Sequence, residues 1–122
     1  MGKKIVIAED DTYSAHLLNF ILEREGYEVH TAKDGGEALE SIKSIVPDLI
    51  LLDVMMPVMD GYDVLKKTKE DEKLKHIPVI MLTAKGQEWD IVKGFELGTD
   101  DYMVKPFSPA ELLVRIKKRL ED

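Results

Sequence analysis

Short hydrophobic runs alternate along the chain with stretches in which apolar residues recur every three or four positions. Three of the runs are almost wholly apolar, as strands are when helices cover both faces of a parallel sheet. A fourth run is weaker, and a fifth is short and less apolar, which suits a strand at the edge of a sheet. The five predicted strands cover residues 5–8, 28–31, 49–52, 79–82 and 101–104.

The stretches between these runs have the spacing of amphipathic helices. Helices are predicted over residues 12–25, 36–45, 61–70, 87–97 and 109–120. The last helix has the clearest start, because Ser108 can cap it, Pro109 suits the first helical position, and Glu111 can complete a capping box. Five short strand–helix units build a parallel sheet with helices on both faces, so the predicted fold class is α/β.

The composition is that of an ordinary globular domain. The chain has 122 residues without a linker or repeat, and it is predicted to form a single domain over residues 1–122. It has no cysteine, which is expected of a cytoplasmic protein in a reducing compartment. No apolar stretch is long enough for a signal peptide or a membrane span. A net charge of −7 argues against nonspecific nucleic-acid binding by this chain.

Polar residues stand directly after four of the predicted strands. They are Glu9, Asp10 and Asp11 after the first strand, Asp53 after residues 49–52, Thr83 after residues 79–82, and Lys105 after residues 101–104. A single carboxylate in such a place is more often a helix cap than a ligand. Parallel strands, however, bring their carboxyl ends to one edge of the sheet, where ligands of open α/β folds bind. We therefore expect these side chains to form one site.

The residue types in this set point to phosphoryl chemistry with a hard cation. Carboxylate oxygens without nearby His or Cys favour Mg²⁺, Mn²⁺ or Ca²⁺ over zinc or copper. An aspartate such as Asp53 can attack phosphorus and form an aspartyl-phosphate. Lys105 would then share the neutralisation of charge with the metal, and the Thr83 hydroxyl would donate to a remaining oxygen. Taken singly, Lys105 could be an exposed loop lysine, and Thr83 a helix cap or turn residue.

Four sequence blocks that hold these residues resemble the response-regulator receiver domain, the CheY-like family. They are EDD at 9–11, LLDVMMPVMDG at 51–61, LTA at 82–84 and DDYMVKPF at 100–107, and the resemblance extends over residues 4–120. The pattern is closest to the receivers of winged-helix DNA-binding regulators. The resemblance implies a five-stranded parallel sheet of strand order 2-1-3-4-5 between two layers of helices, a flavodoxin-like sandwich.

This resemblance assigns the acidic residues to a phosphorylated metal site. It implies that Asp53 is the phosphoacceptor. Asp10, Asp53 and the backbone carbonyl of Met55 are expected to bind Mg²⁺, with Mn²⁺ as a substitute, and Glu9 is expected to act on the metal indirectly.

The resemblance also implies how a phosphoryl group is held and read. Thr83 and Lys105 are expected to contact it, with a cis peptide bond between Lys105 and Pro106. Thr83 and Tyr102 are expected to form a switch that remodels the surface of the fourth helix, the fifth strand and the last helix.

The implied partners follow from two-component signalling. A sensor histidine kinase or a phosphotransfer protein would donate the phosphoryl group in a phosphorelay. The chain is expected to be a signalling phosphoacceptor that promotes its own phosphorylation and slow dephosphorylation, and not an enzyme. A phosphorylation-dependent homodimer is expected through the switch surface, with Asp101–Arg115 and Glu96–Lys117 as ion pairs. Neither nucleic acid nor a membrane is expected to bind this domain directly.

Three alternative functions fit the sequence less well. A haloacid-dehalogenase-type phosphatase needs a second aspartate two residues after the nucleophile, where this chain has Met55. A flavodoxin-like electron carrier needs a hydroxyl- and glycine-rich loop after the first strand, where the acidic residues 9–11 would repel the FMN phosphate. A receiver-like module that no longer accepts phosphate is disfavoured because Asp53, Thr83 and Lys105 are all intact.

Overall fold

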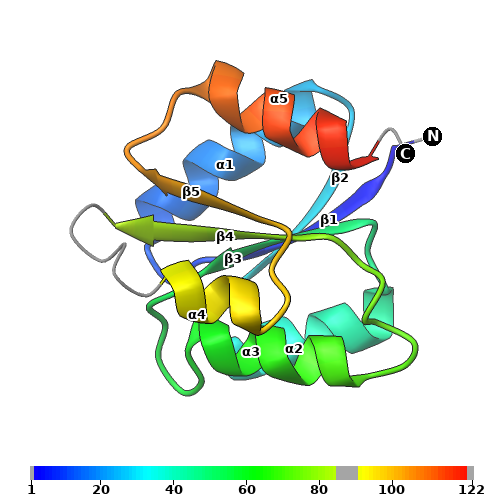
Figure 1. Ribbon diagram of the computed structural model, residues 1–122. Helices are drawn as coiled ribbons and strands as arrows, with labels where there is room; N and C mark the ends of the chain where they lie inside the picture. Colours follow the sequence, from blue (N-terminus) through cyan, green and yellow to red (C-terminus); the bar gives the residue numbers. More distant parts are fainter. Residues whose placement is uncertain (1, 85–90, 121–122) are drawn as a thin grey trace.

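Strands and helices alternate along the whole of the computed structural model, which describes residues 2–84 and 91–120 (Figure 1). In chain order they are β1 (Lys4–Ala8), α1 (Thr12–Arg24), β2 (Glu28–Ala32), α2 (Gly35–Ile45), β3 (Leu49–Asp53), α3 (Gly61–Glu70), β4 (Val79–Ala84), α4 (Ile91–Glu96), β5 (Asp101–Lys105) and α5 (Pro109–Leu120). Neighbouring strands are parallel in the order β2-β1-β3-β4-β5, so the predicted fold class and strand order are confirmed. Of the helix predicted over 87–97, residues 87–90 lie outside the described residues.

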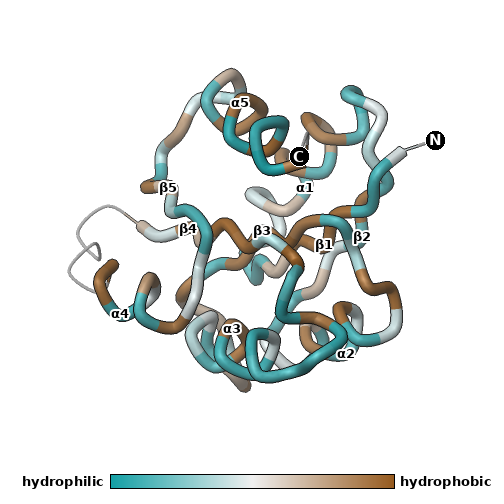
Figure 2. Tube along the Cα trace, turned by 45° about the vertical axis from the view of Figure 1, so that its right-hand side comes forward, coloured by the Kyte–Doolittle hydropathy of each residue, from teal (hydrophilic) through white to brown (hydrophobic). Residues whose placement is uncertain are grey.

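The sheet is covered on both faces. Helices α1 and α5 lie on one face, and α2, α3 and α4 lie on the other (Figure 1). Successive residues of a strand point to opposite faces, so Ile7 and Leu51 pack in the core beneath α1 and α5, whereas Val6 and Leu52 pack beneath α2 and α3. In Figure 2 the hydrophobic colour follows β1 and β3 through the middle of the molecule. The apolar runs are therefore continuous because both faces of the strands are buried, as predicted.

The ends of the elements follow from local side chains. The edge strand β2 is partly exposed, which confirms the edge position predicted for residues 28–31. Asp11 caps α1 by accepting the N–H of Ser14 at 3.0 Å, and Ser108 Oγ accepts the N–H of Glu111 at 3.0 Å at the start of α5. The Glu111 carboxylate accepts from Arg115 at 3.4 Å, within its own helix. Ser108 is thus a cap as predicted, and Glu111 turns along the helix toward Arg115.

The register of the sheet sets the positions of the polar strand ends. Ala8 lies opposite Leu52 across β1 and β3, so the next residues, Glu9 and Asp53, leave neighbouring strands at the same level. On the other side, Lys105 lies opposite Ala84 across β5 and β4. Parallel pairing in this register brings residues far apart in sequence to one edge.

No helix within residues 2–84 and 91–120 is long and apolar enough to cross a membrane.

Candidate phosphorylation and metal site

Three carboxylates meet at the carboxyl ends of β1 and β3. One oxygen from each of Glu9, Asp10 and Asp53 lies within 4.8 Å of the others. Glu9 is 1% exposed and Asp53 is 7% exposed, whereas Asp10 is open to solvent. The cluster is therefore buried on the side of Glu9 and Asp53 and exposed to solvent on the side of Asp10.

Lys105 bridges the two buried carboxylates. Its Nζ lies 2.7 Å from Glu9 Oε1 and 3.2 Å from Asp53 Oδ2. It stands at the end of β5 and is followed by the expected cis bond to Pro106. The alternative that Lys105 is an exposed loop lysine is therefore wrong, because it is a half-buried residue of β5 whose ammonium contacts the acidic cluster.

The other groups of the site come from the loop after β3 and from β4. Met55 donates its backbone N–H to Asp53 Oδ1 at 3.2 Å, so each Asp53 oxygen has one donor. Thr83 lies inside β4 and is fully buried, which rules out a role as a helix cap or turn residue. Its Oγ1 has no hydrogen-bond partner among the described residues. A buried hydroxyl without a hydrogen-bond partner is uncommon and costly. Met81 of β4 lies opposite Leu52 of β3, so Thr83 stands two residues further along β4, close to the end of the strand.

The charges of the site are unbalanced, with two buried carboxylates for one ammonium. Burial is the main cause that raises the pKa of Glu9 from its usual 4.5, and the neighbouring Asp53 acts in the same direction. Lys105 opposes both, and together these effects bring the pKa of Glu9 to about 7. Burial alone would lower the pKa of Lys105, but its hydrogen bond to Glu9 and the charge of Asp53 raise it overall. An additional cation would relieve the excess negative charge.

The residues fit a hard divalent cation. Carboxylate oxygens are the ligands that Mg²⁺ prefers, and Mg²⁺ keeps several of its waters. The solvent-exposed Asp10 and the Asp53 carboxylate, which is 7% exposed, offer oxygens to a cation that approaches from solvent. Glu9 is only 1% exposed, and it holds Lys105 at the shorter distance of 2.7 Å. This difference agrees with a direct role for Asp10 and Asp53 and an indirect role for Glu9.

The aromatic residue expected to switch, Tyr102, is buried on β5 with 8% of its surface exposed. Its hydroxyl lies 2.6 Å from that of Tyr62 on α3, and its ring packs against Phe95 at a centroid distance of 5.9 Å. No motif of the sequence marks Tyr62. Its place on the buried face of α3 marks it as a core residue, but nothing in the sequence indicates that its hydroxyl meets a side chain forty positions away.

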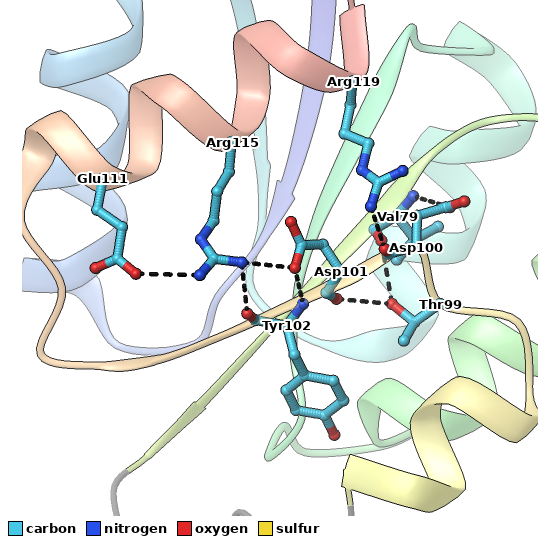
Figure 3. Close-up of polar contacts among 8 residues, drawn as sticks. All are labelled: Val79, Thr99, Asp100, Asp101, Tyr102, Glu111, Arg115 and Arg119. Carbon is cyan, nitrogen blue, oxygen red and sulfur yellow. Dashed lines mark hydrogen bonds and ion pairs between the residues drawn. The ribbon is translucent and has the colours of Figure 1, made fainter.

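Arg115 of α5 contacts β5 within the chain (Figure 3). Arg115 Nη1 donates to Asp101 Oδ1 at 2.6 Å and to the carbonyl of Tyr102 at 3.3 Å. The expected pairing of Asp101 with Arg115 thus exists inside one chain. Lys117, which was expected to pair with Glu96, instead lies 3.2 Å from Glu25 at the end of α1. Pairing of these residues across a dimer stays a prediction.

Comparison with known proteins agrees with this geometry. A family model described as the response regulator receiver domain matches residues 5–117. The alkaline phosphatase synthesis transcriptional regulatory protein PhoP of Bacillus subtilis (strain 168) is 50% identical over 117 residues, which are 96% of this chain and 48% of that protein. The chain therefore spans about half the length of this relative.

Two solved structures extend the comparison to the backbone. The signal receiver domain of a signal transduction histidine kinase from Syntrophus aciditrophicus has a TM-score of 0.91 at 38% identity. The match covers 98% of this chain and 91% of the chain in that structure. The receiver domain of sensor histidine kinase PA1611 from Pseudomonas aeruginosa PAO1, solved with a magnesium ion coordinated in the active site cleft, has a TM-score of 0.92 at 30% identity and covers 100% of both chains.

Proposed function

This chain belongs to the response regulator receiver domain family, a family of phosphoacceptor domains in two-component signalling, and from this premise we propose that Asp53 accepts the phosphoryl group. The observation that carries the proposal is the convergence on Asp53 of Lys105 at 3.2 Å and of the carboxylates of Glu9 and Asp10. No other set of His, Cys, Asp or Glu among residues 2–84 and 91–120 is gathered closely enough to hold a metal ion.

The proposed reaction uses these groups in distinct roles. An Asp53 carboxylate oxygen attacks the phosphorus of a phosphohistidine, the P–N bond breaks, and the leaving imidazole takes up a proton. Lys105 neutralises charge on the phosphoryl oxygens, as its position against Asp53 allows. Thr83 has a free hydroxyl proton to donate to one of those oxygens, because it has no hydrogen-bond partner among the described residues.

Mg²⁺, or Mn²⁺ in its place, would be held by Asp10, Asp53 and the backbone carbonyl of Met55, with Glu9 acting through Lys105. When bound, the cation would supply positive charge to the transferring phosphoryl group. The magnesium ion in the cleft of the PA1611 receiver supports the choice of metal. A general acid or base two residues after Asp53 is ruled out by Met55, which favours a phosphoacceptor over a haloacid-dehalogenase-type phosphatase.

The partners and the output are proposed on the same basis. A sensor histidine kinase or phosphotransfer protein would donate the phosphoryl group to this chain in the cytoplasm. Because PhoP is a transcriptional regulatory protein of about twice the length, an output domain is the proposed target of the switch. The surface of α4, β5 and α5 exposes Val92, Phe95 and Val114, which suits a phosphorylation-dependent homodimer. Sedimentation of the phosphorylated and unmodified protein tests the dimer, and monomers in both states at tens of micromolar would refute it.

Incubation with acetyl phosphate and Mg²⁺, read by intact mass, tests the central proposal. The wild-type protein should gain one phosphoryl group, and Asp53→Asn should gain none. Asp60→Asn is a matched control, because Asp60 is an exposed carboxylate that caps α3 a few residues away, and it should be modified like wild type. No adduct on the wild type, or an equal adduct on Asp53→Asn, would overturn the assignment.

A further inference from the structure

The loop between β3 and α3, residues 54–60, carries a donor to the proposed phosphoacceptor. The backbone N–H of Met55 lies 3.2 Å from Asp53 Oδ1. Within the loop, Val58 has a φ of 72°, in the left-handed region that β-branched residues rarely adopt. A loop with such a residue keeps its shape only where surrounding contacts hold it. The direction in which Met55 points its N–H therefore depends on what the loop rests against.

The loop rests against the N-terminus of α2. Gly35 donates its N–H to the carbonyl of Pro57 at 3.3 Å. A Cβ built on Gly35 would lie 1.8 Å from the carbonyl oxygen of Met59 and 2.6 Å from its carbonyl carbon. Both are backbone atoms, so they cannot turn aside as a flexible side chain could. Any residue other than glycine at position 35 must displace the loop or the helix.

The adjacent Gly36 provides the contrast. A Cβ on Gly36 would have its nearest neighbours at 3.4 Å, on the Asp34 carboxylate, and 3.5 Å, on the Val58 side chain. These are ordinary van der Waals distances. Alanine is the better helix former at both positions, so the two substitutions differ in the contact with the loop and not in helix propensity.

We propose that Gly35 is a positioning residue for phosphorylation: its lack of a side chain lets the β3–α3 loop close on α2 and thereby orients the Met55 backbone toward Asp53. The proposal rests on the proposed function of Asp53. It places a determinant of that chemistry on a different element, behind the loop and outside the carboxylate cluster. In the sequence, Gly35 stands next to the helix predicted over residues 36–45, and nothing there links it to Asp53. In the structure it is the first residue of α2.

Displacing the loop has a predictable consequence for the site. Residues that hold a metal site from behind typically change its affinity by about 10- to 100-fold when they are replaced. A misplacement of about 1 Å by a distant substitution can slow a reaction by about 100-fold. We expect Gly35→Ala to weaken metal binding by about tenfold and to slow phosphorylation by at least as much.

The test compares Gly35→Ala with Gly36→Ala in two measurements. The first is Mn²⁺ affinity without any phosphodonor, from the EPR signal of free Mn²⁺. The second is the rate of adduct formation with acetyl phosphate in excess Mg²⁺. Gly35→Ala should lose about tenfold in affinity, together with a shifted NMR amide signal of Met55, while Gly36→Ala stays within about twofold of wild type. Thermal melts in EDTA report any separate loss of stability.

The outcomes separate the two proposals. If Gly35→Ala binds Mn²⁺ like Gly36→Ala, the positioning role is overturned, even if its melting temperature falls. If wild type binds Mn²⁺ but forms no adduct at Asp53, the proposed function fails instead. Should Gly35→Ala not fold, Pro57→Gly keeps the carbonyl that accepts from Gly35 but frees the backbone of the loop, at an exposed position. Pro57→Gly should also weaken Mn²⁺ binding, and an unchanged affinity in that variant would overturn the positioning role.

Discussion

Replacing Glu9 by glutamine removes a buried carboxyl that opposes folding at neutral pH. The pKa of Glu9 is raised from 4.5 to about 7, chiefly by burial and secondly by Asp53. The folded chain therefore holds this proton more tightly than the unfolded chain. Stability linked to Glu9 is present in full below about pH 4.5 and is lost as the pH rises through about 7. The raised pKa of Lys105 has no effect in this window, because that group stays charged until well above pH 8.

The size of the effect follows from the same shift. Each pKa unit corresponds to about 1.4 kcal/mol, and most of the titration falls between pH 5 and pH 8. The wild-type protein should lose about 2 to 3 kcal/mol in its free energy of unfolding over that range through Glu9 alone, whereas Glu9→Gln should not. Between pH 5 and pH 8, the free energy of unfolding of Glu9→Gln should therefore rise by about 2 to 3 kcal/mol relative to that of the wild type.

Urea unfolding in EDTA at pH 5 and pH 8 measures this difference. With a denaturant slope of about 1 to 3 kcal/mol per molar, the urea midpoints of the two proteins should move relative to each other by about 0.7 to 3 M. Glu40→Gln, on the exposed face of α2, controls for replacing a carboxyl by an amide. A difference between Glu9→Gln and wild type that is the same at both pH values would refute the reasoning. Excess Mg²⁺ should shrink the wild-type loss, because a bound cation favours the charged carboxylates.

Three further substitutions test contacts around the site. Lys69→Met should lower the free energy of unfolding by about 2 to 3 kcal/mol. The reason is that Lys69 Nζ donates to two backbone carbonyls before β4 and lies 3.4 Å from Asp100. A loss smaller than about 1 kcal/mol in urea unfolding would contradict this. Tyr62→Phe should lower the free energy of unfolding by about 1 kcal/mol, because it removes the 2.6 Å hydrogen bond to Tyr102. A double-mutant cycle with Tyr102→Phe should give a coupling energy of about 0.5 to 1 kcal/mol, and purely additive losses would contradict the bond between the two hydroxyls. Lys105→Met should tighten Mg²⁺ binding, measured by calorimetry, because an ammonium no longer competes with the metal for the two buried carboxylates. The same substitution should slow phosphorylation by at least about tenfold. Weaker Mg²⁺ binding would contradict the competition between Lys105 and the metal.

Local patterns predicted the strands and helices, and the strand ends at which the acidic cluster lies, for a physical reason. Strands buried on both faces must be apolar throughout, so the runs at 49–52 and 79–82 were legible without any knowledge of their neighbours. Caps such as Ser108 act within four residues of the chain. Because parallel strands all end at the same edge of the sheet, the sequence alone predicts that Asp53 and Lys105 lie on that edge, and the register then sets how close they come.

Pairings between side chains could not be predicted in this way. Lys117 meets Glu25 because α5 packs beside α1, whereas the resemblance to known receivers suggested only Glu96, across a dimer, as its partner. The bond between the hydroxyls of Tyr62 and Tyr102 depends on how α3 faces β5, which no local pattern encodes. Such contacts join residues that only the packing of the elements brings together.

The sequence by itself determined the order of strands and helices, their α/β class, and the set of acidic, hydroxyl and amino groups that follow the strands. Only the tertiary structure decided how those groups meet. It placed the Lys105 ammonium between Glu9 and Asp53, buried Glu9 deeply enough to raise its pKa, and pressed the loop after Asp53 against Gly35. Periodicity and turn chemistry act over a few residues, whereas charge coupling, burial and close backbone contact depend on distances that exist only once the chain has folded.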